Sequence, residues 1–253
     1  MSYTEIHFHL LPGVDDGPGS TEESVALAAA AVADGTRTIV ATPHVHPQHI
    51  TDPSAIHERV AELTDPLRRG RVSVEVLAGG ELADDMVGRL SHRQLEAIAQ
   101  GPPGRRWVLL EAPFRGMDDA FRAAADELRE RGFAAVIAHP ERAMEGPMAG
   151  AVLERELAAG SAIQLTAWSL VGLYGERART TALGMLNSAP TTAIASDAHG
   201  RERMPCLRLA RDALAAAGER DGERFVATTP QLLLQRGLAL PPRRASLSVS
   251  PSA

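Results

Sequence analysis

Seven short apolar segments separated by helical patterns constrain the fold of this chain more than any other feature of its sequence. They recur at intervals of about 25 to 40 residues, and several are continuously apolar, as in strands buried on both faces of a parallel sheet. The segments cover residues 6–10, 38–41, 72–77, 107–110, 134–138, 162–165 and 192–195. Strands that alternate with helices predict an α/β fold.

Local signals mark the ends of the intervening helices. Ser20, followed three residues later by Glu23, fits a capping box that opens a helix. A glycine precedes several of the predicted strands, where the end of a helix needs a residue in the left-handed conformation. These glycines are Gly35, Gly70, Gly132 and Gly160.

Length and composition favour one barrel-sized domain. A chain of 253 residues suits a single α/β barrel. With 44% hydrophobic and 23% charged residues it can bury a sizeable core. No shift in composition marks a second domain. We therefore predict one domain over residues 1–240 and a disordered tail over residues 241–253, where Pro, Arg and Ser dominate.

Composition also excludes several functions. All 26 basic residues are arginine, so a catalytic or phosphate-loop lysine is excluded. The formal net charge of −6 argues against nucleic-acid binding. Cys206 is the single cysteine and cannot form an internal disulfide. The sequence contains no secretory signal and no apolar stretch of about 20 residues, so we expect a cytoplasmic protein without direct membrane insertion.

Ionisable residues follow six of the seven predicted strands. His7 and His9 alternate in the first strand, which places both on one face of the sheet. In an open sheet functional residues gather at one switch point, whereas in a barrel they surround the whole ring of strand ends. The distribution therefore favours a closed barrel. The other strand-end residues are His44, Glu81, Glu111, His139, Asp197 and His199.

These side chains together predict a metal centre. Glu111 follows a fully apolar strand, and burial of its carboxylate requires a positively charged partner. Asp15 and Asp16, taken alone, are most simply turn residues. Because they follow the first strand, we include Asp16 among the candidate metal ligands. The nine candidate ligands suffice for two or three divalent ions. All are nitrogen or oxygen donors, which suits Mn, Fe or Zn.

Arg142 stands three residues after His139 and is a candidate for binding phosphate, because its forked guanidinium matches phosphate oxygens. The alternative is an ion pair with Glu141 or Glu145, of which Glu141 is expected to face outward. The loop over residues 46–53 forms either part of a substrate rim or a solvated loop.

The motifs that carry these residues resemble the polymerase and histidinol phosphatase (PHP) superfamily. Within it they resemble the bacterial manganese-dependent protein-tyrosine phosphatases of capsule and exopolysaccharide loci, the CpsB type. The resemblance runs from about Glu5 to about Leu233. It rests on E-I-H-F-H-L-L-P-G-V-D-D-G, A-T-P-H, G-E, L-E, A-H-P-E-R and S-D-A-H-G.

The resemblance implies a PHP-type distorted (β/α)7 barrel with two or three metal ions, most often Mn, held by the nine residues. It also implies hydrolysis of phosphotyrosine, typically on the tail of a tyrosine kinase that controls polysaccharide assembly. The resemblance further implies that Arg203 is a second residue that contacts the phosphate. We hypothesise in-line attack on phosphorus by a metal-bridging hydroxide, with His44 as a possible proton donor.

Three other functions compete with this one. A small-molecule phosphomonoesterase, such as a PHP-type histidinol-phosphatase, would use the same metals, and a non-catalytic metal-stabilised binding module would need fewer intact ligands. A cysteine-based phosphatase needs Arg six positions after its cysteine, but Asp212 stands there. We therefore expect Cys206 to be a packing residue.

Overall fold

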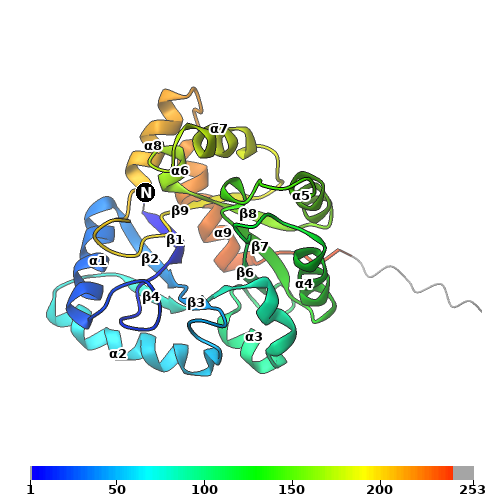
Figure 1. The fold of residues 1–253 in the computed structure, drawn as a ribbon. Helices are drawn as coiled ribbons and strands as arrows, with labels where there is room; N and C mark the ends of the chain where they lie inside the picture. The colour runs from blue at the N-terminus through cyan, green and yellow to red at the C-terminus, as the bar shows by residue number, and fades with distance from the viewer. Residues whose placement is uncertain (1, 242–253) are drawn as a thin grey trace, which may run out of the picture.

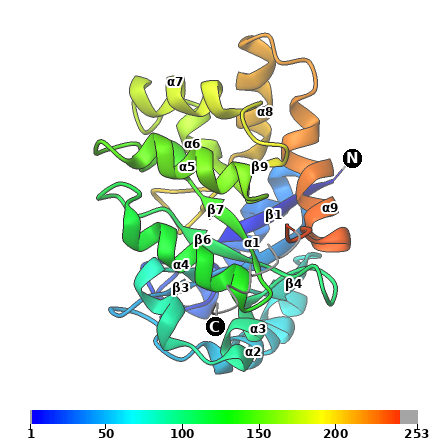
Figure 2. The same ribbon diagram turned by 90° about the vertical axis from the view of Figure 1, so that its right-hand side faces the viewer.

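The chain forms a ring of parallel strands surrounded by helices (Figures 1 and 2). The computed structural model describes residues 2–241, so the predicted tail lies outside the described residues except for residue 241. The strands are β1 (Tyr3–Phe8), β2 (Thr36–Ala41), β3 (His44–Val45), β4 (Glu75–Ala78), β5 (Glu81–Leu82), β6 (Trp107–Glu111), β7 (Ala134–Ala138), β8 (Ala162–Thr166) and β9 (Thr192–Ala195). All seven predicted segments contain strand residues, and β3 and β5 are short continuations of β2 and β4.

Two predicted strands begin three residues away from their start in the structure, and three others differ by one or two residues at one end. The first runs over Tyr3–Phe8 rather than residues 6–10, because Tyr3 and Thr4 pair with β2 despite their polar groups. The third runs over Glu75–Ala78 rather than residues 72–77, because the chain still turns after the preceding helix, where Arg71 has a left-handed backbone with φ of 55°. The polarity of the sequence alone was therefore insufficient to predict where these two strands begin.

Helices cover the outside of the ring and one of its ends (Figure 1). They are α1 (Thr21–Asp34), α2 (Ile56–Arg69), α3 (His92–Ile98), α4 (Asp119–Glu130), α5 (Ala149–Ala158), α6 (Ala167–Leu170), α7 (Glu176–Met185), α8 (Leu207–Ala216) and α9 (Thr229–Arg236). Short turns of other helix types cover Pro53–Ala55, Asp84–Arg89, Pro140–Arg142 and Arg224–Thr228. Within residues 2–241 no helix has the length and apolar character needed to cross a bilayer.

The helix-end signals are confirmed with two exceptions, Gly70 and half of the capping box, because the Glu23 carboxylate accepts from the N–H of Gly19 rather than from that of Ser20. Ser20 caps α1 by accepting a hydrogen bond from the backbone N–H of Glu23. Gly35 ends the same helix with φ of 121°. Gly70 follows α2 but has φ of −72°, and Arg71 takes the left-handed conformation instead. A Cβ on Gly70 would lie 2.7 Å from Val25 Cγ1, so glycine serves the close approach of α1 and α2 there.

The ring is built from two parallel sheets. One has the order β1-β2-β4 and the other the order β3-β5-β6-β7-β8-β9. The break between them falls where Pro43 separates β2 from β3, since proline cannot donate a hydrogen bond to a neighbouring strand. It also falls at Gly79 and Gly80, between β4 and β5, where an added Cβ on either residue would lie under 3.0 Å from a neighbouring side chain.

Backbone contacts between the first and last strands close the ring. Phe8 forms a parallel bridge with Ala198, just after β9. The N–H of His9 donates to the carbonyl of Ala198 at 2.9 Å, and the N–H of Asp197 donates to the carbonyl of His7 at 3.1 Å. The fold is therefore a distorted barrel with seven strand positions, as the resemblance implies.

Two apolar layers hold the barrel together. The larger lies between the strands and the outer helices and includes Phe8, Leu110 and Phe121. The smaller joins residues of several strands, such as Ile6 and Trp107, to Leu233 of α9. The indole N–H of Trp107 donates to the carbonyl of Leu233 at 2.9 Å. Because Trp107 begins β6, α9 covers the amino-terminal end of the strands, and the carboxyl-terminal end stays open to build a site.

Candidate metal centre

All nine candidate ligands lie together at the carboxyl-terminal end of the barrel strands. They form four overlapping groups, in each of which the possible ligand atoms lie within 4.8 Å of one another. The groups are His9, Asp16, His44 and His199; His7, His139 and Asp197; His7, His9 and Glu81; and His44, Glu81 and Glu111. The convergence predicted from the strand ends is thus present in the structure, and among the strand positions only β8 contributes no member.

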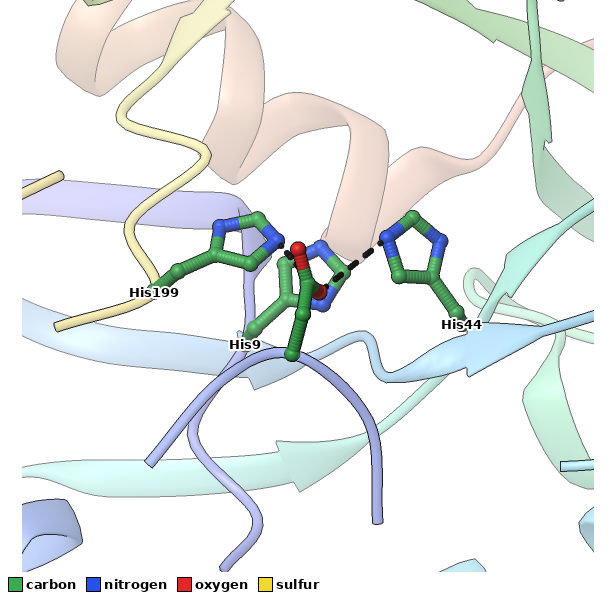
Figure 3. Close-up of side chains that lie close together, drawn as sticks. His9, His44 and His199 are labelled. Carbon is green, nitrogen blue, oxygen red and sulfur yellow. Dashed lines mark ion pairs between the residues drawn. The ribbon is translucent and has the colours of Figure 1, made fainter. Parts of the chain in front are cut away.

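Three imidazoles turn toward one another on one side of the site (Figure 3). The rings of His9 and His199 stack with their centroids 3.6 Å apart. His44 Nε2 and His199 Nε2 lie 3.4 Å and 3.2 Å from the same atom, Oδ1 of Asp16. The loop after β1 therefore supplies a carboxylate to histidines that follow β2 and β9.

Glu81 lies at the centre of the site and contacts four histidines. Its Oε2 is 3.2 Å from His7 Nε2, 3.3 Å from His9 Nε2 and 3.0 Å from His44 Nδ1. Its Oε1 is 2.8 Å from His139 Nε2. A carboxylate in this position can bridge two ions, because its two oxygens face different histidines.

The deepest part of the site shows that a cation fits the residues present. Asp197 Oδ1 lies 3.3 Å from His7 Nε2, and the Nε2 atoms of His7 and His9 are only 3.2 Å apart. Within residues 2–241, the buried Nδ1 of His139 has neither a hydrogen-bond nor an ion-pair partner, and Glu81 Oε2 and His199 Nε2 make ion-pair contacts but no hydrogen bond. Unpaired buried polar atoms cost free energy unless something binds them, and nitrogen and oxygen donors suit divalent ions.

The electrostatics of the site point the same way. Burial disfavours the charged imidazole of His7, but Glu81 and Asp197 outweigh it and raise its pKa to about 9. Burial also opposes the charge on His44, yet Glu81 and Asp16 raise its pKa to about 11. Burial and the nearby charge of Glu81 raise the pKa of Glu111 to about 7. The carboxylates thus hold protons on His7 and His44, which bound ions would displace, whereas burial and the nearby His9 lower the pKa of His199 to about 4.

Two candidate ligands have a strained backbone. His139, directly after β7, has φ of 34°, and Asp197, after β9, has φ of 52°. Non-glycine residues in this region cost about 1–3 kcal/mol and occur where the surroundings impose the conformation, often at functional sites. The strain turns both side chains into the mouth of the barrel.

Sequence reasoning missed residues that orient the ligands. Asp15 Oδ2 lies 2.7 Å from His9 Nδ1 and accepts a hydrogen bond from the N–H of His44 at 3.0 Å. Gln164 Oε1 lies 2.8 Å from His7 Nδ1. The signal for Gln164 was present, because a lone amide stands inside the apolar strand β8. For Asp15, a position in a turn did not indicate that the side chain orients a histidine.

The expectation that Glu141 faces outward was wrong. Its side chain is buried, and Oε1 accepts hydrogen bonds from the N–H of Thr166 at 3.0 Å and from the hydroxyl of Ser169 at 2.8 Å. The turn after β7 is therefore tied to the start of α6. Polarity predicted an exposed acid, but the donors of Thr166, at the end of β8, and of Ser169, in α6, partly compensate for its burial.

Both candidate arginines lie at the mouth and contact candidate ligands. Arg142 Nη1 donates to Asp197 Oδ2 at 3.0 Å, and the structure pairs it with neither Glu141 nor Glu145. Arg203 Nη2 donates to Asp16 Oδ2 at 2.8 Å. Their guanidinium groups are therefore within reach of any anion that binds at the centre.

Two remaining sequence predictions concern residues around the site. Cys206 is buried at the start of α8, and burial raises the pKa of its thiol above the usual range, so it is a packing residue rather than a nucleophile. In the loop over residues 46–53, His49 is exposed and its ring stacks on His44 with centroids 5.4 Å apart. The loop therefore lies beside the centre.

Comparison with known sequences gives a match over nearly the whole chain. The profile described as capsular polysaccharide synthesis, CpsB/CapC, matches residues 3–235. Tyrosine-protein phosphatase YwqE of Bacillus subtilis is 33% identical over 77% of this chain and 76% of its own length. Putative tyrosine-protein phosphatase CapC of Staphylococcus aureus is 31% identical over 80% of this chain and 79% of its own length.

Solved structures agree with this match. A chain from the crystal structures of YwqE from Bacillus subtilis and CpsB from Streptococcus pneumoniae, described as metal-dependent tyrosine phosphatases, is 29% identical. It aligns with a TM-score of 0.78 over 91% of this chain and 94% of that chain. The phosphotriesterase homology protein of Escherichia coli aligns with a TM-score of 0.53 over 94% of this chain and 96% of its own at 13% identity, which supports the fold alone.

Proposed function

This chain belongs to the CpsB/CapC family of capsular polysaccharide synthesis, and we propose that it is a metal-dependent protein-tyrosine phosphatase. The observation that carries the proposal is the meeting of nine nitrogen and oxygen ligands with two arginines at one end of the barrel. Relatives named as tyrosine-protein phosphatases and a structural neighbour described as metal-dependent support it.

The nine residues would hold two or three divalent ions, and Mn is the ion we propose. The four overlapping groups share His7, His9, His44 and Glu81, as expected of a centre with more than one ion. Bound ions would supply Lewis-acid stabilisation of the phosphoryl oxygens and a water of lowered pKa. Three divalent ions against the four carboxylates would leave a charge of about +2, which attracts a phosphate dianion.

Arg142 and Arg203 are proposed to bind the outer oxygens of the phosphate. Each guanidinium now pairs with a candidate ligand, Asp197 or Asp16. When these carboxylates bind cations, their attraction for the arginines weakens, and the forked donors become free for a phosphate. Arg142 is better placed than Arg203 to bind the phosphate, because the rings of Phe114 and Tyr174 hold its guanidinium in position.

We assign His44 to ion binding rather than to proton donation. Its Nδ1 faces Glu81 and its Nε2 faces Asp16, so neither ring nitrogen is left to protonate a leaving group. A phenolate is also a better leaving group than an alkoxide, which reduces the need for a general acid. The substrate we propose is a phosphotyrosine protein, namely the cytoplasmic tail of a tyrosine kinase of polysaccharide synthesis.

The test compares two substrates on the full chain loaded with Mn. We expect kcat/KM to be higher for a phosphotyrosine peptide than for histidinol phosphate. A chelator should abolish the activity on both substrates. Cys206→Ser should retain activity, because the buried thiol takes no part, whereas His9→Ala should lose it.

Each alternative predicts a different result. Activity that survives chelation would refute the metal-dependent mechanism. Faster hydrolysis of histidinol phosphate would identify a small-molecule phosphatase, and Mn binding without turnover of either substrate would identify a binding module.

A further inference from the structure

An exposed aromatic residue lies at the mouth of the barrel beside the candidate metal centre. Phe114 stands three residues after Glu111 and is 53% exposed. Its ring is nearly parallel to the imidazole of His139, at 7° with centroids 5.7 Å apart. The guanidinium of Arg142 lies 4.7 Å from its centroid. Phe114 therefore contacts one candidate ligand, His139, and the candidate phosphate-binding arginine.

A small cavity opens next to these side chains. Its volume is about 300 Å³, and its lining includes Phe114, Arg142, Met144 and Tyr174. The lining also includes Arg177, Glu141 and Glu145, so the cavity combines aromatic and apolar walls with two cations and two acids. A substrate whose phosphate reaches Arg142 would place the group attached to its ester oxygen near the same walls.

The two aromatic rings that contact Arg142, those of Tyr174 and Phe114, differ in how much of their surface is exposed to solvent. Tyr174 is half-buried, its hydroxyl is buried, and its ring centroid lies 4.2 Å from the guanidinium carbon. Phe114 makes a comparable contact with the arginine but leaves more than half of its surface to solvent. Tyr174 is therefore placed to support Arg142, whereas Phe114 also has surface available for a ligand.

We propose that Phe114 determines substrate specificity by stacking against the aryl ring of the phosphate ester. The inference rests on the proposed phosphatase function and names the part of the substrate that the enzyme recognises beyond the phosphate. Aromatic rings gain from offset stacking in a way that saturated rings do not. Phe114 thus favours esters of phenols, such as phosphotyrosine, over esters of aliphatic alcohols.

A purely supporting role for Phe114 predicts a different pattern. If the ring only held Arg142, its loss would weaken all phosphate ligands in the same proportion, because the phosphate is common to them. A stacking role predicts that its loss weakens aryl ligands more than alkyl ligands. The ratio between two matched ligands therefore separates the two roles, and Tyr174→Leu provides the control for loss of support alone.

The experiment measures binding of phenylphosphonate and cyclohexylphosphonate to the full chain loaded with Mn, by calorimetry. The two probes have similar size, and only one is aromatic. We expect Phe114→Leu to reduce the preference for the aryl probe by about fivefold to tenfold. Phe114→Trp should keep the preference, and Tyr174→Leu should weaken both probes in equal proportion. The same ratios are then measured as kcat/KM for phenyl and cyclohexyl phosphate.

The outcomes distinguish this inference from the function on which it rests. An unchanged ratio in Phe114→Leu, or an equal loss for both probes, overturns the role of Phe114 while leaving the phosphatase intact. A wild-type chain that hydrolyses no phosphomonoester with Mn overturns the proposed function instead. Phe114→Trp keeps the test decisive if Phe114→Leu folds poorly, because loss of the preference in the tryptophan variant would also contradict stacking.

Discussion

At the scale of single residues, the site consists of candidate ligands and of residues that contact and orient them. Glu81 shows the first kind, since its two oxygens contact four histidines from different strands. Asp15 shows the second, since it binds the ring nitrogen of His9 that faces away from Glu81. Carboxylates that hold the second nitrogen of a histidine fix its tautomer and its orientation toward a metal.

Removal of the Asp15 carboxylate should therefore weaken metal binding without removing a ligand. We expect Asp15→Asn to lower Mn affinity by about 10–100-fold, because His9 loses a charged partner. Titration calorimetry of the metal-free chain with Mn measures this. Asp65→Asn is the control, since Asp65 is an exposed partner of Arg68 on α2. Equal affinities in both variants would show that Asp15 is only a turn residue.

At the scale of the elements, side chains beyond the ligands hold the strand ends in register. Glu5 of β1 is fully buried, and it accepts hydrogen bonds from the N–H of Ser196 at 2.8 Å and from the Ser196 hydroxyl. Ser196 directly precedes Asp197. The contact therefore closes the barrel between β1 and β9 at the point where a candidate ligand leaves the sheet.

Loss of Glu5 should destabilise the barrel strongly. Glu5→Ala leaves two buried donors of Ser196 unpaired and creates a cavity, so we expect the free energy of unfolding to fall by about 2–4 kcal/mol. Urea denaturation of the metal-free chain measures the change. In Glu62→Ala, which alters an exposed residue of α2, the free energy should change by less than about 0.5 kcal/mol. Similar effects of the two substitutions would contradict this role.

At the scale of the whole molecule, charge is distributed unevenly. The chain carries a formal net charge of −6, and four of its acids meet at one end of the barrel with five histidines. Burial of so many ionisable groups in one place is unfavourable unless cations bind them. Metal binding is therefore expected to stabilise the entire fold, because the ligands come from strands around the ring.

Added Mn should raise the thermal stability of the chain. A ligand at 100 times its Kd stabilises the folded state by about 2.7 kcal/mol, which corresponds to a rise in Tm of roughly 5–10 °C for a chain of this size. Differential scanning fluorimetry with and without a chelator measures the shift. His199→Ala, which removes one candidate ligand, should show a smaller rise, and an unchanged Tm in the wild-type chain would argue against a structural contribution of the ions.

Prediction from sequence succeeded where one residue carries the signal by its own position. A histidine or acid directly after an apolar strand, such as Glu111 or His139, was correctly expected at the carboxyl-terminal end of the barrel, because parallel strands in a barrel end at the same rim. Prediction failed for Glu141, whose burial depends on donors of Thr166 and Ser169 that are distant in sequence. It failed for Gly70 because the close approach of Val25 is invisible without the packed helices.

Local polarity and the order of residues along the chain were sufficient to predict the alternation of strands and helices, the ionisable residues at the strand ends and the chemical type of the candidate ligands. The folded structure was needed to show which side chains orient these candidate ligands and which rings surround Arg142. Asp15 reaches His44 and Phe114 reaches Arg142 because closure of the barrel brings separate strand ends within a few ångströms, and no local pattern encodes those distances.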